Sequence, residues 1–240
     1  MTLEEIINYR RSVRHYKNEP IDAEKVKHCI ELATFAPNSS NMQLWEFYHI
    51  VNPEILRKVA VACLDQESAK TAQQMVVFVT RQDLHRKREK EMLALESQNV
   101  HKNSPELKQA KRIKSWKMYY GIIMPFLYIR FFGVLGFIRK VMVNIIGLFR
   151  PIVYQVSEND MRVVVHKTCA LAAQTFMLAM ANEKYDTCPM EGFDSRKVKS
   201  ILKLPYGAEI NMVISCGTRE EQGVWGDRMR IPFGEVYRET

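Results

Sequence analysis

Three guanidinium groups and one hydroxyl lie within five residues in the stretch Arg10-Arg11-Ser12-Val13-Arg14. In an extended backbone successive side chains point to opposite faces, so Arg10, Ser12 and Arg14 face one way and Arg11 faces the other. Two permanent cations and a donor hydroxyl then span about 7 Å, which suits a phosphate group and the polar chain attached to it. The alternative interpretation is a solvated basic turn, because runs of charge usually lie at the surface.

Length and composition indicate a folded globular protein. The chain has 240 residues, of which 47% are hydrophobic and 26% charged, and we treat residues 1–240 as a single domain with a substantial core. The N-terminus carries the acidic pair Glu4-Glu5 and lacks the apolar segment of a secretory signal. The five cysteines are odd in number and widely spaced, which argues against a disulfide framework or a zinc site and predicts a cytoplasmic location.

The net charge of +8 belongs to one segment. Between Leu107 and Ser157 there is no Asp or Glu. The nine basic residues of this segment are Lys108, Lys111, Arg112, Lys114, Lys117, Arg130, Arg139, Lys140 and Arg150. Without them the rest of the chain has a net charge of −1 (+8 minus 9). The overall charge therefore gives little support for nucleic-acid binding by the whole protein.

Hydrophobic periodicity and turn residues divide the flanks of the chain into alternating helices and strands. The pattern predicts helices over 23–35, 53–64, 163–183 and 195–202, and strands over 45–51, 75–79 and 209–216. The helix over 163–183 has almost no charged face, so we expect it to be the central buried helix. Residues 37–41 are predicted to form a polar loop and residues 188–194 a turn.

The middle of the chain, residues 84–155, differs from both flanks. It begins with a charged helical stretch over about 84–99 and then becomes apolar and basic. Its longest uncharged run, 118–129, has only 12 residues, whereas a membrane-spanning helix needs about 20. We therefore predict that the apolar part forms a pair of amphipathic helices within a helical insertion.

The common nucleotide and metal motifs are absent from the sequence. No G-x-G-x-x-G or G-x-x-x-x-G-K pattern occurs, so neither a dinucleotide-binding fold nor a P-loop is indicated. The six histidines show no metal-ligand spacing with cysteines or carboxylates, so we expect no metal site.

Five separated motifs follow one another in a recognisable order along nearly the whole chain. They are Arg10–Arg14 (R-R-S-V-R), Ala36–Trp45 (A-P-N-S-S-N-M-Q-L-W), an apolar strand over 75–79, Pro189–Phe193 (P-M-E-G-F) and Arg228–Pro232 (R-M-R-I-P). Together they resemble the FMN-dependent nitroreductase family. The sequence departs from the family pattern at Leu44, where proline is common, and in its longer and more apolar middle segment.

The resemblance implies an α+β fold, in which helices flank a mixed sheet, and an intertwined homodimer with two FMN sites at its interface. It implies that the FMN phosphate, ribityl chain and ring edge are held by Arg10, Arg11, Ser12, Arg14, Arg228 and Arg230. The partner subunit would supply Pro37, Asn38, Ser39 and Asn41, and Gln66 would contact the ring. The residues along the ring, at its reactive nitrogen N5, would be Pro189, Met190, Glu191 and Gly192.

Two residues are expected to act beside the reacting atoms, Glu191 and Gly192. Glycine lets the backbone approach N5 closely, so that the amide of Gly192 can donate a hydrogen bond. A cation such as Arg14 at the ring edge would stabilise the negative charge of the reduced flavin. For Glu191, a role in the active site and a solvent-facing loop carboxylate are both open.

The resemblance implies an oxidoreductase in which NAD(P)H reduces FMN and the flavin then reduces a nitroaromatic, a quinone or a similar small electron acceptor. The alternative is a flavin-binding or redox-sensing protein with slow turnover or none. Nucleic-acid binding is not expected, because segment 107–157 interleaves its charges with long apolar runs. That segment is either a lid that packs on the dimer or an interfacial segment on an anionic membrane surface.

Overall fold

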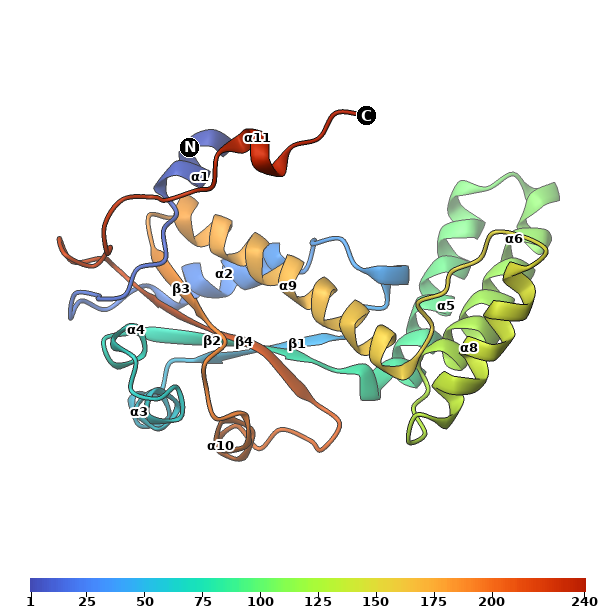
Figure 1. Cartoon of the computed structure of the whole chain (residues 1–240), viewed down its shortest axis with the longest axis horizontal. Helices are drawn as coiled ribbons and strands as arrows, with labels where there is room; N and C mark the ends of the chain where they lie inside the picture. The colour runs from blue at the N-terminus through green and yellow to red at the C-terminus, as the bar shows by residue number, and fades with distance from the viewer.

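The computed structural model describes residues 1–240 as a four-stranded sheet with helices on both faces and a further group of helices at one end (Figure 1). The α-helices are α1 (Leu3–Tyr9), α2 (Ala23–Ala33), α3 (Pro53–Ala62), α4 (Glu67–Lys70), α5 (His85–Asn103), α6 (Glu106–Met118), α7 (Met124–Tyr128), α8 (Val134–Gly147), α9 (Glu158–Asn182), α10 (Ser195–Ile201) and α11 (Phe233–Val236). The strands are β1 (Trp45–Ile50), β2 (Gln74–Thr80), β3 (Asp186–Met190) and β4 (Glu209–Gly217). Short helical turns occur at η1 (Ser39–Asn41), η2 (Gln82–Leu84) and η3 (Tyr119–Ile123), the last of them a π-helix.

The four strands pair antiparallel in the order β1-β2-β4-β3. Every residue of β2 is buried, because its two faces both meet helices. Val76 and Phe78 join the cluster under α9, whereas Val77 joins the cluster on the opposite face, as the two-residue period of a strand requires. The expected α+β architecture with helices flanking a sheet is confirmed. Its parallel component is limited to one bridge, between Ser12 and Thr187.

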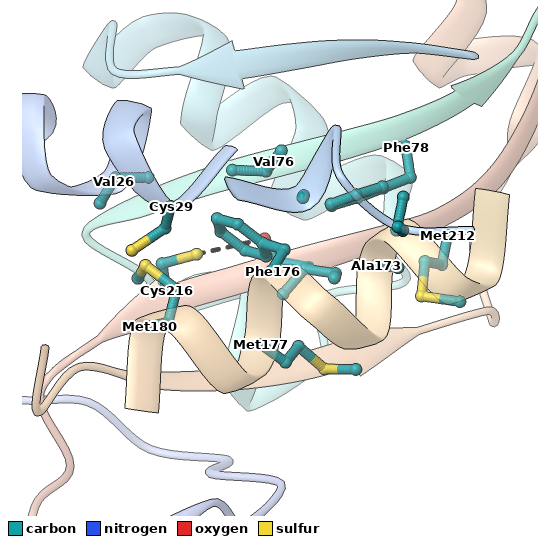
Figure 2. Packing of buried hydrophobic residues seen from close by; sticks show 14 of the residues in the cluster. Val26, Cys29, Val76, Phe78, Ala173, Phe176, Met177, Met180, Met212 and Cys216 are labelled. Atoms are coloured by element: carbon teal, nitrogen blue, oxygen red, sulfur yellow. Dashed lines mark hydrogen bonds between the residues drawn. The ribbon is translucent and has the colours of Figure 1, made fainter. Parts of the chain in front are cut away.

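The central helix α9 covers one face of the sheet together with α2 (Figure 1). Ser157 caps its N-terminus, where the Ser157 hydroxyl accepts from the backbone N–H of Asp160 in a capping box. Phe176 is fully buried against Phe78, with ring centroids 5.5 Å apart, and Figure 2 shows it among the sulfur-containing side chains of this cluster. By length and composition α9 could cross a bilayer, but here it is the core helix.

The opposite face of the sheet is covered by α3, α4 and α10. Asn52 caps the start of α3 and Asp194 caps the start of α10, each accepting from two backbone amides. The buried side chain of Val13 belongs to the same cluster. The arginine stretch is therefore anchored to the core through one residue.

A helical lobe, residues 85–147, projects from one end of the sheet (Figure 1). Within it α5 packs against α6, η3 and α7. The part predicted as a pair of amphipathic helices contains two helical stretches, because α6, η3 and α7 run on from one another and α8 is separate. Pro125 lies in the first turn of α7, where its missing N–H is tolerated. Gly133 precedes α8 with φ +83°, a conformation that favours glycine.

The prediction of a turn over 188–194 was partly wrong, because β3 occupies 186–190 and the turn begins after Met190. Pro189 fits within β3 because this strand lies at the edge of the sheet, where a residue without an N–H leaves no ladder bond unmade. The other predicted helices and strands are present, with ends that differ by a few residues.

Candidate cofactor site

The stretch 10–14 is extended, as the alternation argument required. The backbone N–H of Val13 donates to the carbonyl of Thr187 on β3 at 3.2 Å, and that of Arg14 donates to the carbonyl of Gly223 at 2.7 Å. Val13 points into the core. Arg10, Ser12 and Arg14 therefore share the face opposite to Val13.

These side chains line a cavity of about 400 Å³ between the arginine stretch and the chain that follows β4, which we call the arginine cavity. Its lining residues are Arg10, Arg11, Ser12, Arg14, Val224, Trp225, Asp227, Arg228, Met229 and Arg230. Arg11 is among them, although strict alternation predicted that it would face away from Arg10 and Arg14. Five of the ten carry a guanidinium and only one, Asp227, carries a carboxylate. Such an excess of positive charge favours an anionic ligand.

The five guanidiniums differ in what they already bind. Those of Arg10 and Arg14 have no hydrogen-bond or ion-pair partner in the chain, whereas Arg11 donates to the carbonyl of Gly226 at 2.8 Å. Burial, and then repulsion from Arg228 and its neighbour Arg230, lowers the pKa of the Arg10 guanidinium. An anion between these groups would relieve that repulsion.

Arg228 has a second task that the sequence did not suggest. Its guanidinium donates to the carbonyls of Ile7, Asn8 and Arg10 at 2.8–3.2 Å, and so satisfies groups left free at the end of α1. Arg230 donates only to the carbonyl of Met229 next to it. Both line the arginine cavity, but Arg228 is held in place by the helix end.

A second cavity of about 260 Å³ adjoins the first. Arg14 and Trp225 line both cavities, and the Arg14 guanidinium lies 4.6 Å from the centre of the Trp225 ring. The remaining lining residues of the second cavity are Gln66, Glu67, Ser68, Cys188 and Pro189. The structure thus brings the predicted residues Arg14, Gln66 and Pro189 to one place.

The turn after β3 is fixed by a side chain from another element. The amide nitrogen of Gln66 donates to the carbonyls of Gly192 at 2.7 Å and Cys63 at 3.0 Å. The N–H of Gly192 has no acceptor within the chain, so it is free to donate to a ligand. Glu191 is exposed and makes no hydrogen bond or ion pair.

Met190 contributes to this region differently from its predicted neighbours. Its side chain is buried in the core and its sulfur accepts from the hydroxyl of Ser68 at 3.3 Å. Only its backbone can therefore face a ligand. Burial raises the pKa of the Cys188 thiol beside it, which keeps that thiol protonated at neutral pH.

The loop over 37–43 lies apart from the arginine cavity in one chain. Pro37, Asn38 and Asn41 line a separate cavity of about 540 Å³, and Ser39 is exposed beside it. The side-chain amide oxygen Oδ1 of Asn38 accepts from the backbone N–H of Gln43 at 2.9 Å. Three residues within four positions have positive φ: Ser40 (55°), Asn41 (51°) and Gln43 (46°). This loop is held in a demanding conformation.

The helical lobe holds that loop in place. The hydroxyl of Tyr119 lies 2.7 Å from that of Ser40, and Tyr120 donates to the Ser40 carbonyl at 2.9 Å. Met42 and Leu44 are buried in one cluster with residues of α5, η3, α7 and α9. Leu44, the departure from the family pattern, therefore packs against the lobe.

Sequence reasoning missed two residues of the site. Trp225 stacks on Arg14 and separates the two cavities. Gly223 accepts from the Arg14 backbone and leaves no room for a side chain, because a Cβ there would lie 2.5 Å from the carbonyl oxygen of His15. The segment Gly223-Val224-Trp225-Gly226, directly before the basic pair, was the signal that could have identified them.

The donors present fit FMN. Unpartnered cations in the arginine cavity suit its phosphate, because guanidinium forks bind phosphate oxygens with charge-assisted hydrogen bonds. The adjoining cavity is lined by the Trp225 indole, Pro189 and the side chain of Gln66, which suit a flat ring with polar edges. Gln66 also bonds the carbonyl of Gly192, whose N–H is free.

Comparisons with known proteins agree with this fit. The model of the Nitroreductase family matches residues 7–218. Protein DrgA of Synechocystis sp. is 24% identical over 235 residues, covering 96% of this chain and 92% of DrgA. MhqN of Bacillus subtilis is 22% identical over 232 residues, covering 96% of this chain and 95% of MhqN.

Solved structures share the fold. The nitroreductase family protein of Streptococcus pneumoniae superposes with a TM-score of 0.70 at 19% identity, covering all of both chains. A protein of Exiguobacterium sibiricum solved in complex with FMN also gives a TM-score of 0.70 at 19% identity, covering 100% of this chain and 98% of that one.

Proposed function

Because the chain belongs to the nitroreductase family, we propose that it is an FMN-dependent oxidoreductase that oxidises NAD(P)H and reduces a small electrophilic acceptor. FMN, when bound, supplies hydride and electron transfer, and the protein supplies position and charge. Nitroaromatics and quinones are the acceptor classes that we propose. MhqN, which is named as a proposed NAD(P)H nitroreductase, supports the choice of nicotinamide as electron donor.

One observation carries this proposal: the two cations without partners, Arg10 and Arg14, line a cavity that adjoins a second cavity lined by Gln66, whose side chain holds the turn at Gly192. In this proposal Arg10 and Ser12 bind the phosphate end of the cofactor. Arg14 lies at the shared wall of the two cavities, where a permanent cation stabilises negative charge that develops on the ring. Gln66 keeps the Gly192 amide in place through its bond to the Gly192 carbonyl.

We also propose that the working unit is a homodimer. Within one chain, the arginine cavity and the cavity lined by Pro37, Asn38 and Asn41 are separate, so a second copy is needed to bring both sets to one ligand. The chain after β4 supports this arrangement, because Met229 and Phe233 are 84% and 72% exposed. Large apolar side chains in an extended arm are typical of segments that a partner covers.

We place the protein in the cytoplasm. All five cysteines are free thiols and all are buried, which is typical of a reducing compartment.

The test begins with the purified full-length chain, which should be yellow or should become yellow on addition of FMN. NADH or NADPH should bleach the flavin absorbance, and addition of a quinone or nitroaromatic should restore it over many turnovers. A protein that takes up no FMN would refute the proposal. A protein that binds FMN but turns over no acceptor in a broad panel would instead be a flavin-storage or redox-sensing protein.

A further inference from the structure

Helix α8 in the helical lobe exposes its apolar side. Its exposed apolar residues recur at intervals of three and four and are Val134, Phe137, Ile138, Val141, Met142 and Ile145, which is the spacing of a single helix face. Asn144 is the one polar residue among the exposed residues of α8. Phe132 just before the helix and Phe149 just after it are 96% and 85% exposed.

The two cations of α8 point the other way. Arg139 is only 1% exposed and donates to the carbonyls of Val156 at 2.7 Å and Phe126 at 2.6 Å. Lys140 lies 3.0 Å from the carboxylate of Asp160. Its charged residues are therefore bound to the protein, and the outward stripe carries no charge. An ordinary surface helix has the opposite arrangement.

Unpaired positive charge is concentrated in the same lobe as this stripe and in the return loop after it. The residues Lys108, Lys111, Arg112, Lys114 and Lys117 on α6, and Arg150 after α8, are exposed and form no ion pair. The segment 107–157 contains no carboxylate, and the carboxylate that lines a cavity with one of these cations is Glu96 of α5, beside Arg112. An exposed apolar patch of this size marks an interaction site, and the cations define the charge of what covers it.

We propose that the outward stripe of α8 docks on a membrane surface that contains anionic phospholipids. With 14 residues the helix is about 21 Å long, too short to span a bilayer, so it lies in the plane of the interface. Apolar side chains, three of them phenylalanine, enter the acyl boundary while the lysines and arginines contact the headgroups.

Charge complementarity favours lipid over a second copy of the chain as the occupant. Two copies meeting through this stripe would bring their unpaired cations together without an acid from the same segment, and like charges at close range repel. An anionic leaflet instead attracts every one of them. This inference does not depend on the proposed oxidoreductase activity.

The test is co-sedimentation of the full-length protein with vesicles of phosphatidylglycerol and, separately, of phosphatidylcholine, at low and high salt. We expect binding to the anionic vesicles that falls at high salt. The double variant F137S/F149S should lower that binding about tenfold or more, because its side chains are the apolar contact. Tyr206→Ser, which removes a fully exposed aromatic residue outside the lobe, is the matched control and should change nothing.

Substitution of lysines by glutamine tests whether the cations of the lobe contact the anionic headgroups. The triple variant K111Q/K114Q/K117Q should lower binding to anionic vesicles about a hundredfold, since each cation near an anionic leaflet contributes about fivefold. The triple variant K17Q/K58Q/K167Q removes three exposed lysines outside the lobe and should have a much smaller effect.

Three outcomes would overturn the proposal. The first is equally weak binding of the natural sequence to both kinds of vesicle. The second is binding that F137S/F149S leaves unchanged while the variant keeps its thermal stability. The third is a change in oligomeric state of F137S/F149S in solution, measured by light scattering without vesicles, which would assign the stripe to a second copy of the chain.

Discussion

Replacing each arginine of the stretch 10–14 in turn should separate ligand binding from structural support. The guanidiniums of Arg10 and Arg14 line the arginine cavity and make no hydrogen bond within the free protein, so replacement by alanine removes none. Each variant would lose a charge-assisted bond to the FMN phosphate or ring. Such a bond contributes about 1.5–3 kcal/mol, so the dissociation constant for FMN should rise about 10- to 150-fold. The Arg11 guanidinium already donates to the Gly226 carbonyl, so Arg11→Ala should raise the dissociation constant for FMN less than about threefold.

The same substitutions should affect the stability of the flavin-free protein in opposite directions. Arg10→Ala removes repulsion from Arg228 and Arg230, so the melting temperature without FMN should stay the same or rise. Arg14→Ala removes the contact with Trp225, and such a contact contributes about 0.5–1 kcal/mol at an exposed site. The melting temperature without FMN should therefore fall slightly. Arg10→Lys keeps the charge but not the donor fork and should bind FMN with intermediate affinity.

The assay is quenching of FMN fluorescence on titration with flavin-free protein, paired with thermal denaturation in the absence of FMN. Equal losses of affinity at Arg10, Arg11 and Arg14 would refute the reasoning, because they would mean that the cavity selects for net charge and not for the guanidiniums that have no partner in the chain. A loss of affinity that only follows a loss of stability would refute it as well.

Three further predictions concern the supporting structure. Gly223→Ala should weaken FMN binding and lower stability by about 2 kcal/mol, because the new Cβ would lie 2.5 Å from the His15 carbonyl oxygen; unchanged binding would contradict this. Burial raises the pKa of Glu89 to about 7, so the free energy of unfolding should fall as pH rises from about 4.3 to 7. Glu89→Gln should therefore stabilise the protein at pH 8 by up to about 3 kcal/mol and little at pH 4, measured by urea denaturation. Phe176→Ala should cost about 3–5 kcal/mol in the same assay, whereas Phe233→Ala, at an exposed position, should leave the stability of the monomeric core unchanged.

The parts of the fold that could be predicted are those decided by short-range patterns. The run around Val76 and Phe78 is apolar at every position because β2 is central, and a continuous apolar run predicts a buried strand. Likewise the near absence of charge in α9 predicted its central place. The common face of Arg10, Ser12 and Arg14 followed from side-chain alternation once an extended backbone was assumed for the arginine stretch.

The parts that failed depend on neighbours distant in the sequence. Pro189 suggested a turn, because proline has no N–H for the hydrogen bonds of a sheet. It fits within β3 only because this strand lies at the edge of the sheet. Arg139 would be assigned to the solvent face of α8, yet carbonyls of Phe126 and Val156 draw it inward. The role of Arg228 at the end of α1 joins residues more than 200 positions apart, and no local pattern encodes such a contact.

The pairing of the arginine stretch with β3 also bears on the solubility of the protein. β3 is the last strand of the sheet, and an uncovered strand edge presents backbone groups with which another chain can pair and aggregate. Val13 donates to Thr187 on that edge, so the segment that carries the proposed cofactor donors also closes the sheet. Its arginines add like charge, which repels an approaching second sheet. A chain shortened from its N-terminus past Val13 should therefore lose FMN and begin to aggregate in the same step.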